Sequence, residues 1–435
     1  MTLVVRFFVV VYLVFLLFLN SAIQTQQVRK SALAWQVERI TVKGASFPKL
    51  KGTEISRLRL IAFKNNKLIP VPFQIDEQDG KNMFVLPDLS GKYVGDGDGG
   101  RLDDNDELAF MAFDAGEKGT VENAKNYHEI EIRNGADGAV AWVYLADFKG
   151  DPPPKADADY VAYNKKGNRE EIVTEYYIQG FNDQHVFFDD LRILPPAGGN
   201  GRNFIDKMKM RTAVQAAGGK ITVARNENDF KSTVVGVIDG PVRVIRRNDT
   251  RMTLLAGVKS PSIIVDATFY KCSYEVPSVF SLPFRMDLVA SGAQYRQGGD
   301  LNQNAVGMKY YNNFEIEGVV YDGKMSEREV EIARSEKTHY WGMLSGAPGT
   351  LLYVGRWQDK MPIKILAYYR DDPSALDPPE NVPGQMMFGW RFENLLNVKG
   401  ATYSFNLLNY IIPNFDGNIQ RVVSLIEKSF EVKVR

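Results

Sequence analysis

The sequence has little of the chemistry that usually identifies an enzyme or a nucleic-acid-binding protein. Its 435 residues contain one cysteine, Cys272, which excludes an internal disulfide bond and leaves a small buried side chain as the expected role. There are only three histidines, and no two have metal-ligand spacing. Lysine plus arginine and aspartate plus glutamate number 53 each, well mixed along the chain, which argues against a nucleic-acid partner. Phosphate-binding and serine-nucleophile motifs are also missing.

The first 25 residues read as an export signal. Arg6 precedes an uninterrupted apolar run over residues 7–19, and small or polar residues follow at 20–22. This is the order of a secretory signal peptide, and the run is shorter than the ~20 residues that a membrane-spanning helix needs. We therefore expect a periplasmic or secreted protein with a signal peptide at residues 1–25. An uncleaved N-terminal membrane anchor is the alternative.

Most of the remaining sequence alternates with the period of β-strands. Residues 128–133 and 139–146 alternate on either side of the turn sequence Asn-Gly-Ala-Asp-Gly, which predicts a β-hairpin. Helical periodicity is short and is found best at residues 325–336 and 419–428. Numerous strands with frequent turns predict an all-β protein built from sandwiches.

Three successive prolines at residues 152–154 mark a domain boundary, because they can join neither a sheet nor a helix interior. We predict a small N-terminal β-sandwich over residues 30–150. A larger β-supersandwich-like domain is expected over residues 156–435.

An acidic, glycine-rich loop leads into an apolar segment at residues 108–113, which reads as a core strand because both of its faces are apolar. Crowded carboxylates repel one another unless a cation lies between them, and calcium prefers oxygen ligands. The loop therefore predicts a structural calcium site, and an exposed Asp/Gly turn is the alternative. The candidate ligands are Asp96, Asp98, Asp103, Asp104, Asp106 and Glu107.

The same region carries a resemblance to a known group of proteins. Residues 71–77 read Val-Pro-Phe-Gln-Ile-Asp-Glu, a Gly-Asp-rich spacer follows, and residues 106–110 read Asp-Glu-Leu-Ala-Phe. This pattern resembles the N-terminal β-domain of secreted bacterial proteins, many of them uncharacterised and some found among polysaccharide-degrading proteins. The resemblance covers residues 65–115 and implies a large β-supersandwich behind this domain. It also implies glycan binding or glycan processing as a function.

No catalytic constellation stands out, although three residues are candidates for ligand binding. His339 and Trp341 flank a tyrosine and could line a sugar site, and Arg243 belongs to a cationic cluster that could meet uronate carboxylates. Core or solvent-facing structural roles are the alternatives for all three. The paired acids Asp189 and Asp190 are expected to point to opposite faces of a strand, which would separate them.

The leading hypothesis is an exported cell-envelope protein that recognises, and could also process, a polysaccharide, with a structural calcium ion. The rival is a non-catalytic envelope scaffold that binds another protein. A third option is a lyase that uses a tyrosine or histidine base and an arginine to neutralise a uronate.

Overall fold

The computed structural model describes most of the chain. The described residues are 32–87, 99–182, 187–216, 218–253, 259–260, 262–281, 285–288, 290–358, 361–372, 374–377, 386–400 and 402–435. The predicted signal segment and two of the proposed calcium ligands, Asp96 and Asp98, lie outside them. The fold is all-β with several antiparallel sheets, as the sequence predicts. None of the helices within the described ranges combines the length and the apolar character that crossing a membrane would require.

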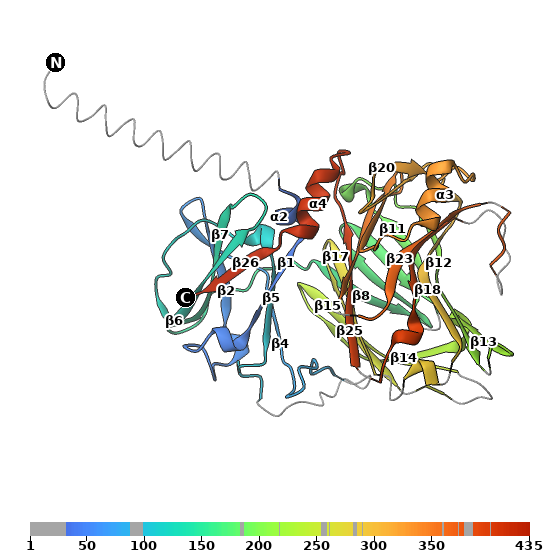
Figure 1. Cartoon of the computed structure of the whole chain (residues 1–435). Coiled ribbons are helices and arrows are strands. Elements are labelled where there is room, and N and C mark those ends of the chain that lie inside the picture. The colour runs from blue at the N-terminus through green and yellow to red at the C-terminus, as the bar shows by residue number, and fades with distance from the viewer. Residues whose placement is uncertain are drawn as a thin grey trace, which may run out of the picture. The chain divides into compact units, whose positions relative to one another are not determined.

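Among the described residues the chain divides into two compact units (Figure 1). Unit 1 comprises residues 32–77, 99–157 and 418–435, and unit 2 comprises residues 78–87 and 158–417. The segment that contains the three prolines, residues 149–160, forms no strand.

Unit 1 is a sandwich of two antiparallel sheets. The smaller sheet has the order β1 (Arg39–Lys43), β5 (Glu107–Met111) and β4 (Gln74–Asp76). The larger sheet has the order β26 (Phe430–Val434), β6 (Ala124–Asn134), β7 (Val140–Phe148), β2 (Arg59–Lys64) and β3 (Lys67–Pro70). Two helices, α2 (Leu33–Val37) and α4 (Ile419–Glu427), belong to this unit. The predicted hairpin is the β6–β7 pair, in which Ile130 lies opposite Val143.

The predicted core strand is the centre of the smaller sheet. Strand β5 pairs with β1 on one side and β4 on the other, and Leu108, Ala109 and Phe110 are fully buried. Leu108 and Phe110 pack in one apolar cluster with Ile130 and other residues of the larger sheet. The acidic loop therefore does lead directly into the core.

The end of the described chain differs from the predicted domain boundary. Residues 418–435 belong to unit 1, whereas the prediction assigned them to the second domain. Strand β26 pairs antiparallel with β6, with Val432 opposite Ile132, and the two lie side by side in Figure 1. The preceding helix α4, predicted at residues 419–428, buries Val422 and Leu425. Pairing with β26 satisfies backbone groups along the edge of β6 that would otherwise need water.

The described residues of unit 2 form three antiparallel sheets. The four-stranded sheet has the order β11 (Phe188–Ile193), β10 (Tyr177–Phe181), β9 (Arg169–Thr174) and β8 (Val161–Lys166). The five-stranded sheet has the order β13 (Ile221–Asn226), β12 (Ile205–Ala216), β18 (Gly292–Leu301), β24 (Met386–Glu393) and β23 (Lys364–Asp371). The nine-stranded sheet has the order β14 (Phe230–Asp239), β15 (Arg243–Met252), β16 (Ile263–Tyr270), β17 (Ser273–Ser281), β25 (Thr402–Ile411), β22 (Gly349–Trp357), β21 (Trp341–Gly346), β19 (Lys309–Asn312) and β20 (Glu315–Val320). The short predicted helix at residues 325–336 is α3 (Glu327–Arg334).

The five-stranded and nine-stranded sheets pack face to face through aromatic side chains. Tyr353 of β22 lies 5.1 Å from Phe388 and 4.9 Å from Trp390, both on β24, between ring centroids. The next aromatic of β22, Trp357, lies 5.8 Å from the same tryptophan. Large aromatic rings thus fill the space between the layers, as expected for a sandwich core.

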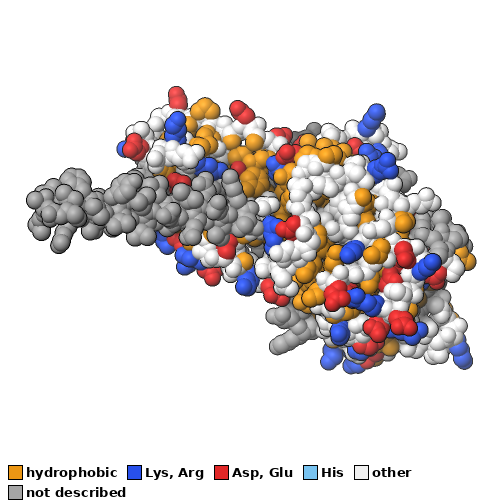
Figure 2. All heavy atoms as spheres, turned by 90° about the horizontal axis from the view of Figure 1, so that it is seen from above, with side chains coloured by type: hydrophobic (Ala, Val, Ile, Leu, Met, Phe, Trp, Pro, Cys, Tyr) orange, Lys and Arg blue, Asp and Glu red, His pale blue; other side chains and the backbone are white. Residues whose placement is uncertain are grey.

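The surface reflects the balanced composition. On the face shown in Figure 2, lysine and arginine side chains lie among aspartate and glutamate side chains. The formal net charge of the chain is zero at neutral pH.

Candidate functional site

One cavity in unit 2 lies where strands β11 and β12 begin. It has a volume of about 290 Å³, near the lower end of the range for small-molecule sites. Three carboxylates, one ammonium group and two amides line it, together with the apolar side chains of an aromatic residue and a methionine. The lining residues are Asn182, Phe187, Asp189, Asp206, Lys207, Met208, Glu227 and Asn228, and we call this cavity the β11–β12 pocket.

Two of its carboxylates come from β-bulges. The pairing of β10 with β11 shifts at Gly180/Phe181, so that Asp189 is the extra residue on β11. The pairing of β12 with β18 shifts between Ile205 and Lys207, so that Asp206 is the extra residue on β12. A bulge bends the strand and re-aims a side chain, and bulges are over-represented beside functional sites. Two bulges on different sheets therefore direct two acids into one pocket.

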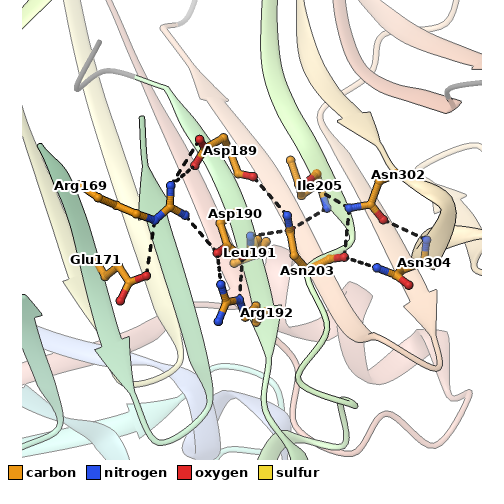
Figure 3. A network of polar contacts seen from close by, with 10 residues as sticks. All are labelled: Arg169, Glu171, Asp189, Asp190, Leu191, Arg192, Asn203, Ile205, Asn302 and Asn304. Carbon is orange, nitrogen blue, oxygen red and sulfur yellow. Dashed lines mark hydrogen bonds and ion pairs between the residues drawn. The ribbon is translucent and has the colours of Figure 1, made fainter. Parts of the chain in front are cut away.

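The first bulge also corrects an expectation about Asp189 and Asp190. Adjacent residues of a regular strand point to opposite faces, which predicted that these two acids would be separated. Instead, Arg169 of β9 contacts both: its Nη1 lies 3.1 Å from Asp189 Oδ1 and its Nη2 lies 3.1 Å from Asp190 Oδ2 (Figure 3). The alternation fails here because the bulge adds a residue between the paired positions.

An amide network fixes the backbone beside the pocket (Figure 3). The side chain of Asn203 accepts hydrogen bonds from the backbone N–H groups of Leu191 and Ile205 and donates to the carbonyl oxygen of Asp189. The side chain of Asn302 donates to the carbonyl oxygens of Asn203 and Ile205. These bonds join the end of β18 and the start of β12 to β11. Both bulged acids are consequently held on an ordered frame.

The third carboxylate connects the pocket to an ion-pair cluster on the face of the five-stranded sheet opposite the aromatic core. Glu227, in the turn after β13, contacts Arg211 of β12. The Asp377 carboxylate lies 3.5 Å from Arg211, 3.7 Å from Lys209, and also contacts Arg296 of β18.

The cluster contains three acids and three cations, so its charges balance. They are Glu227, Asp300 and Asp377 with Lys209, Arg211 and Arg296. Lys209 and Asp300 approach within 2.5 Å, with side chains only 5% and 0% exposed. Buried charges need such compensation, and the cluster joins the pocket lining through Glu227.

The pocket is chemically suited to polyhydroxylated ligands. Carboxylates accept hydrogen bonds from hydroxyl groups, amides both donate and accept, and the ammonium of Lys207 donates. The ring of Phe187 supplies apolar surface and is itself fixed by the ring of Phe230 at 5.8 Å. Sequence reasoning missed these residues, and only the Asp189–Asp190 pair had drawn attention to the region.

The acidic loop of unit 1 can be followed from Asp103 onward. The carboxylate of Asp103 accepts hydrogen bonds from the backbone N–H groups of Asn105 and Asp106. The carboxylate of Asp106, which is fully buried, accepts one from the N–H of Asp103. These two acids therefore close a tight turn on each other's backbone.

Lysines contact the other two described acids of this loop. Asp104 lies 2.6 Å from the ammonium of Lys51, and Glu107 lies 3.4 Å from that of Lys43. Within the described residues, no group of three or more His, Cys, Asp or Glu side chains is arranged to hold a metal ion. Two of the proposed calcium ligands, Asp96 and Asp98, lie outside the described residues.

The three ligand-binding candidates from the sequence are buried and apart from the β11–β12 pocket. Arg243, 1% exposed, donates from Nη1 to the Tyr270 hydroxyl at 3.2 Å. His339 and Trp341 are 0% and 2% exposed. Arg243 stands on β15 and Trp341 on β21, five strand positions apart in the nine-stranded sheet, which is about 24 Å at the usual strand spacing. The structure does not gather these residues into one cleft.

His339 is part of the aromatic core. Its Nε2 lies 3.2 Å from the Tyr353 hydroxyl, and its ring lies 6.2 Å from that of Trp390. Burial lowers the pKa of His339 from 6.5 to about 3, so the imidazole is neutral at physiological pH. A ring in this position packs against its neighbours and has no access to an external ligand.

No family model matches the chain. No curated protein matches it either. The similar solved structures include an alpha-mannosidase from Enterococcus faecalis V583, with 9% identity over 92% of this chain and a TM-score of 0.41. A glycosyl hydrolase family 38 protein from Enterococcus faecalis has 10% identity over 91% of this chain and a TM-score of 0.41.

A protein described as a mutarotase, from Salmonella typhimurium, has 8% identity, a TM-score of 0.30, and coverage of 60% of this chain and 97% of its own. The present chain spans 45% of the length of each Enterococcus protein. The fold and the pocket themselves define the class, an all-β protein of two units with an acid-lined pocket in the larger unit.

Proposed function

We propose that the chain is an exported cell-envelope protein that recognises a polysaccharide through the β11–β12 pocket of unit 2. The observation that supports this most is the convergence of two bulged acids, Asp189 and Asp206, with Glu227 in one small pocket. Three carboxylates in a confined space attract a ligand rich in hydroxyl donors. The pocket volume, about 290 Å³, suits a small ligand such as one sugar unit of a longer chain.

Ion pairs fix two carboxylates of the pocket in place, which favours ligand binding. Arg169 and Arg211 hold Asp189 and Glu227 in fixed positions before any ligand arrives. Side chains that are already fixed lose less conformational entropy when they bind. More of the free energy of their hydrogen bonds to a sugar therefore contributes to affinity. Export through the N-terminal signal would place such a site in contact with envelope polysaccharides. A structural calcium ion in the acidic loop of unit 1 remains part of the proposal.

Affinity electrophoresis and calorimetry with neutral and uronate-containing polysaccharides test the proposal. We expect retention by at least one polysaccharide, and Asp206→Asn should weaken it about tenfold or more, because a hydrogen bond to a charged group is worth ~1.5–3 kcal/mol. The matched control is Asp249→Asn, on β15 of the same unit and outside the pocket lining. The proposal fails if no polysaccharide is retained, or if Asp206→Asn binds as tightly as Asp249→Asn.

A further inference from the structure

A second pocket, in unit 1, has the opposite chemical character to the first. It has a volume of about 630 Å³ and lies beside the N-terminal half of strand β6. Four cationic side chains, one carboxylate, one amide and one tyrosine line it. These residues are Lys49, Lys118, Lys125, Asn126, Tyr127, Glu129 and Arg435, and we call this cavity the basic pocket.

The acids near the basic pocket do not cancel its charge. Glu129 is shared between Lys118, at 3.5 Å, and Arg435, at 3.0 Å. Arg435 also lies 2.7 Å from Glu131, which is outside the lining.

The two remaining lysines are less compensated. Lys125 lies 3.9 Å from Asp147, a carboxylate that Arg57 also contacts at 3.1 Å. Among the described residues, the ammonium of Lys49 has no ion-pair partner, and only its backbone N–H is engaged. Lys49, Lys118 and Lys125 are exposed, so their ammonium groups are accessible from solvent.

A buried histidine holds two walls of this pocket together. The backbone N–H of Lys49 donates to His128 Nε2 at 3.2 Å, and the opposite ring nitrogen, Nδ1, lies 3.1 Å from the backbone oxygen of Arg435. Because Nε2 accepts, Nδ1 must carry the proton and donate. Burial is the main cause that lowers the pKa of His128, and the neutral ring suits both bonds. The segments that carry Lys49 and Arg435 are thus joined through one side chain.

The aromatic side of the pocket is also fixed. Tyr127 is 36% exposed, and its ring lies edge-on to the buried ring of Tyr144, with centroids 6.3 Å apart. The Tyr144 hydroxyl accepts a hydrogen bond from the backbone N–H of Gly119, next to Lys118. A half-exposed ring beside several ammonium groups can contact the apolar face of a sugar while the cations contact its charged substituent.

We infer that the basic pocket binds an anionic sugar unit, one that carries a carboxylate, sulfate or phosphate group. This site is independent of the polysaccharide function proposed for unit 2, because it lies in the other unit and uses cations where the β11–β12 pocket uses acids. Lys49, Lys118 and Lys125 contact the anionic group, and Tyr127 packs against the sugar ring.

Calorimetric titrations of the full chain with four monosaccharide probes test this inference. The probes are glucuronate, glucose 6-sulfate, glucose 6-phosphate and uncharged glucose, each at low and at high sodium chloride concentration, and inorganic phosphate is titrated in parallel. We expect one or more of the charged sugars to bind and glucose to fail. The affinity should fall as salt rises, since exposed charges are screened. Equal binding of glucose and the charged probes, or equal binding of inorganic phosphate and the best sugar, overturns the inference.

Single substitutions test whether the basic pocket is the binding site. Lys49→Gln and Lys118→Gln should each weaken the best probe about fivefold or more, because each removes a charged contact. The control Lys67→Gln removes a lysine from β3, three strand positions from β6 in the same sheet, and should bind like the native chain. If Lys67→Gln loses as much affinity as Lys49→Gln and Lys118→Gln, the basic pocket is not the binding site. Asp206→Asn should leave this binding unchanged, which separates it from the function proposed for unit 2.

Discussion

The buried imidazole of His339 should make unit 2 sensitive to acid. In the folded protein its pKa is lowered from 6.5 to about 3, and burial is the cause. Between these two values the unfolded chain binds a proton that the folded chain does not, so stability falls as pH falls. The stability that depends on the neutral His339 imidazole is fully present above pH 6.5 and is lost progressively toward pH 3. At pH 5 the loss relative to pH 7.5 amounts to about 2 kcal/mol, at 1.36 kcal/mol for each pH unit.

The substitution His339→Gln removes the titrating group and keeps a side chain that can reach the Tyr353 hydroxyl. Urea titrations at pH 7.5 and pH 5.0 give the free energy of unfolding of each protein. We expect the native chain to lose about 2 kcal/mol more than His339→Gln between the two pH values, whatever the variant costs at neutral pH.

Tyr353→Phe is the matched control, because it removes the hydroxyl at 3.2 Å but leaves the buried imidazole. It should retain the acid sensitivity of the native chain. If the native chain and His339→Gln lose the same free energy, burial does not hold this imidazole neutral.

Three further outcomes can be measured on the same protein. If a calcium ion stabilises the acidic loop of unit 1, EGTA should lower the melting temperature by several degrees and added calcium should restore it; identical melting with and without EGTA would refute the ion. Burial raises the pKa of Cys272 to about 12, so a thiol reagent at pH 8 should modify the chain only after denaturation, and rapid modification of the native chain would contradict this. Arg246→Met should destabilise unit 2 by about 3 kcal/mol in urea titrations, because it leaves Glu170, fully buried and 2.7 Å from Arg246, without its main counter-charge. The double variant Arg246→Met/Glu170→Leu should recover much of that loss, and a double variant as unstable as the single one would count against the explanation.

Much of the fold could be predicted because it depends on local patterns. The apolar run after the acidic loop became β5, the turn sequence at residues 134–138 joined β6 to β7, and both short helices formed near their predicted positions. The pairing of strand β26 could not be predicted in this way. Residues 430–434 alternate as a strand should, but nothing in that segment indicates a partner about 300 residues earlier in the sequence. Pairing at that distance depends on the completed sandwich of unit 1.

The aromatic and histidine candidates were harder to interpret for a physical reason. A ring near a histidine can serve as a sugar platform or as core packing, and both uses favour the same residue types. For His339 and Trp341 the outcome depends on which face of β21 and its neighbours meets the five-stranded sheet. Only the assembled layers decide this, and they bury both side chains.

The carboxylates show that crowding in the sequence is a poor guide to crowding in space. Asp103, Asp104, Asp106 and Glu107 are near neighbours along the chain, yet two of them contact backbone N–H groups and two contact different lysines. Asp189, Asp206 and Glu227 are separated by about twenty residues each, yet they line one pocket. Two β-bulges bring Asp189 and Asp206 to the pocket, and the turn after β13 adds Glu227. A bulge cannot be read from the alternation of one strand, because it is a mismatch between two. An acid-rich site in a β protein is therefore better sought where strand pairing shifts than where acidic residues cluster in sequence.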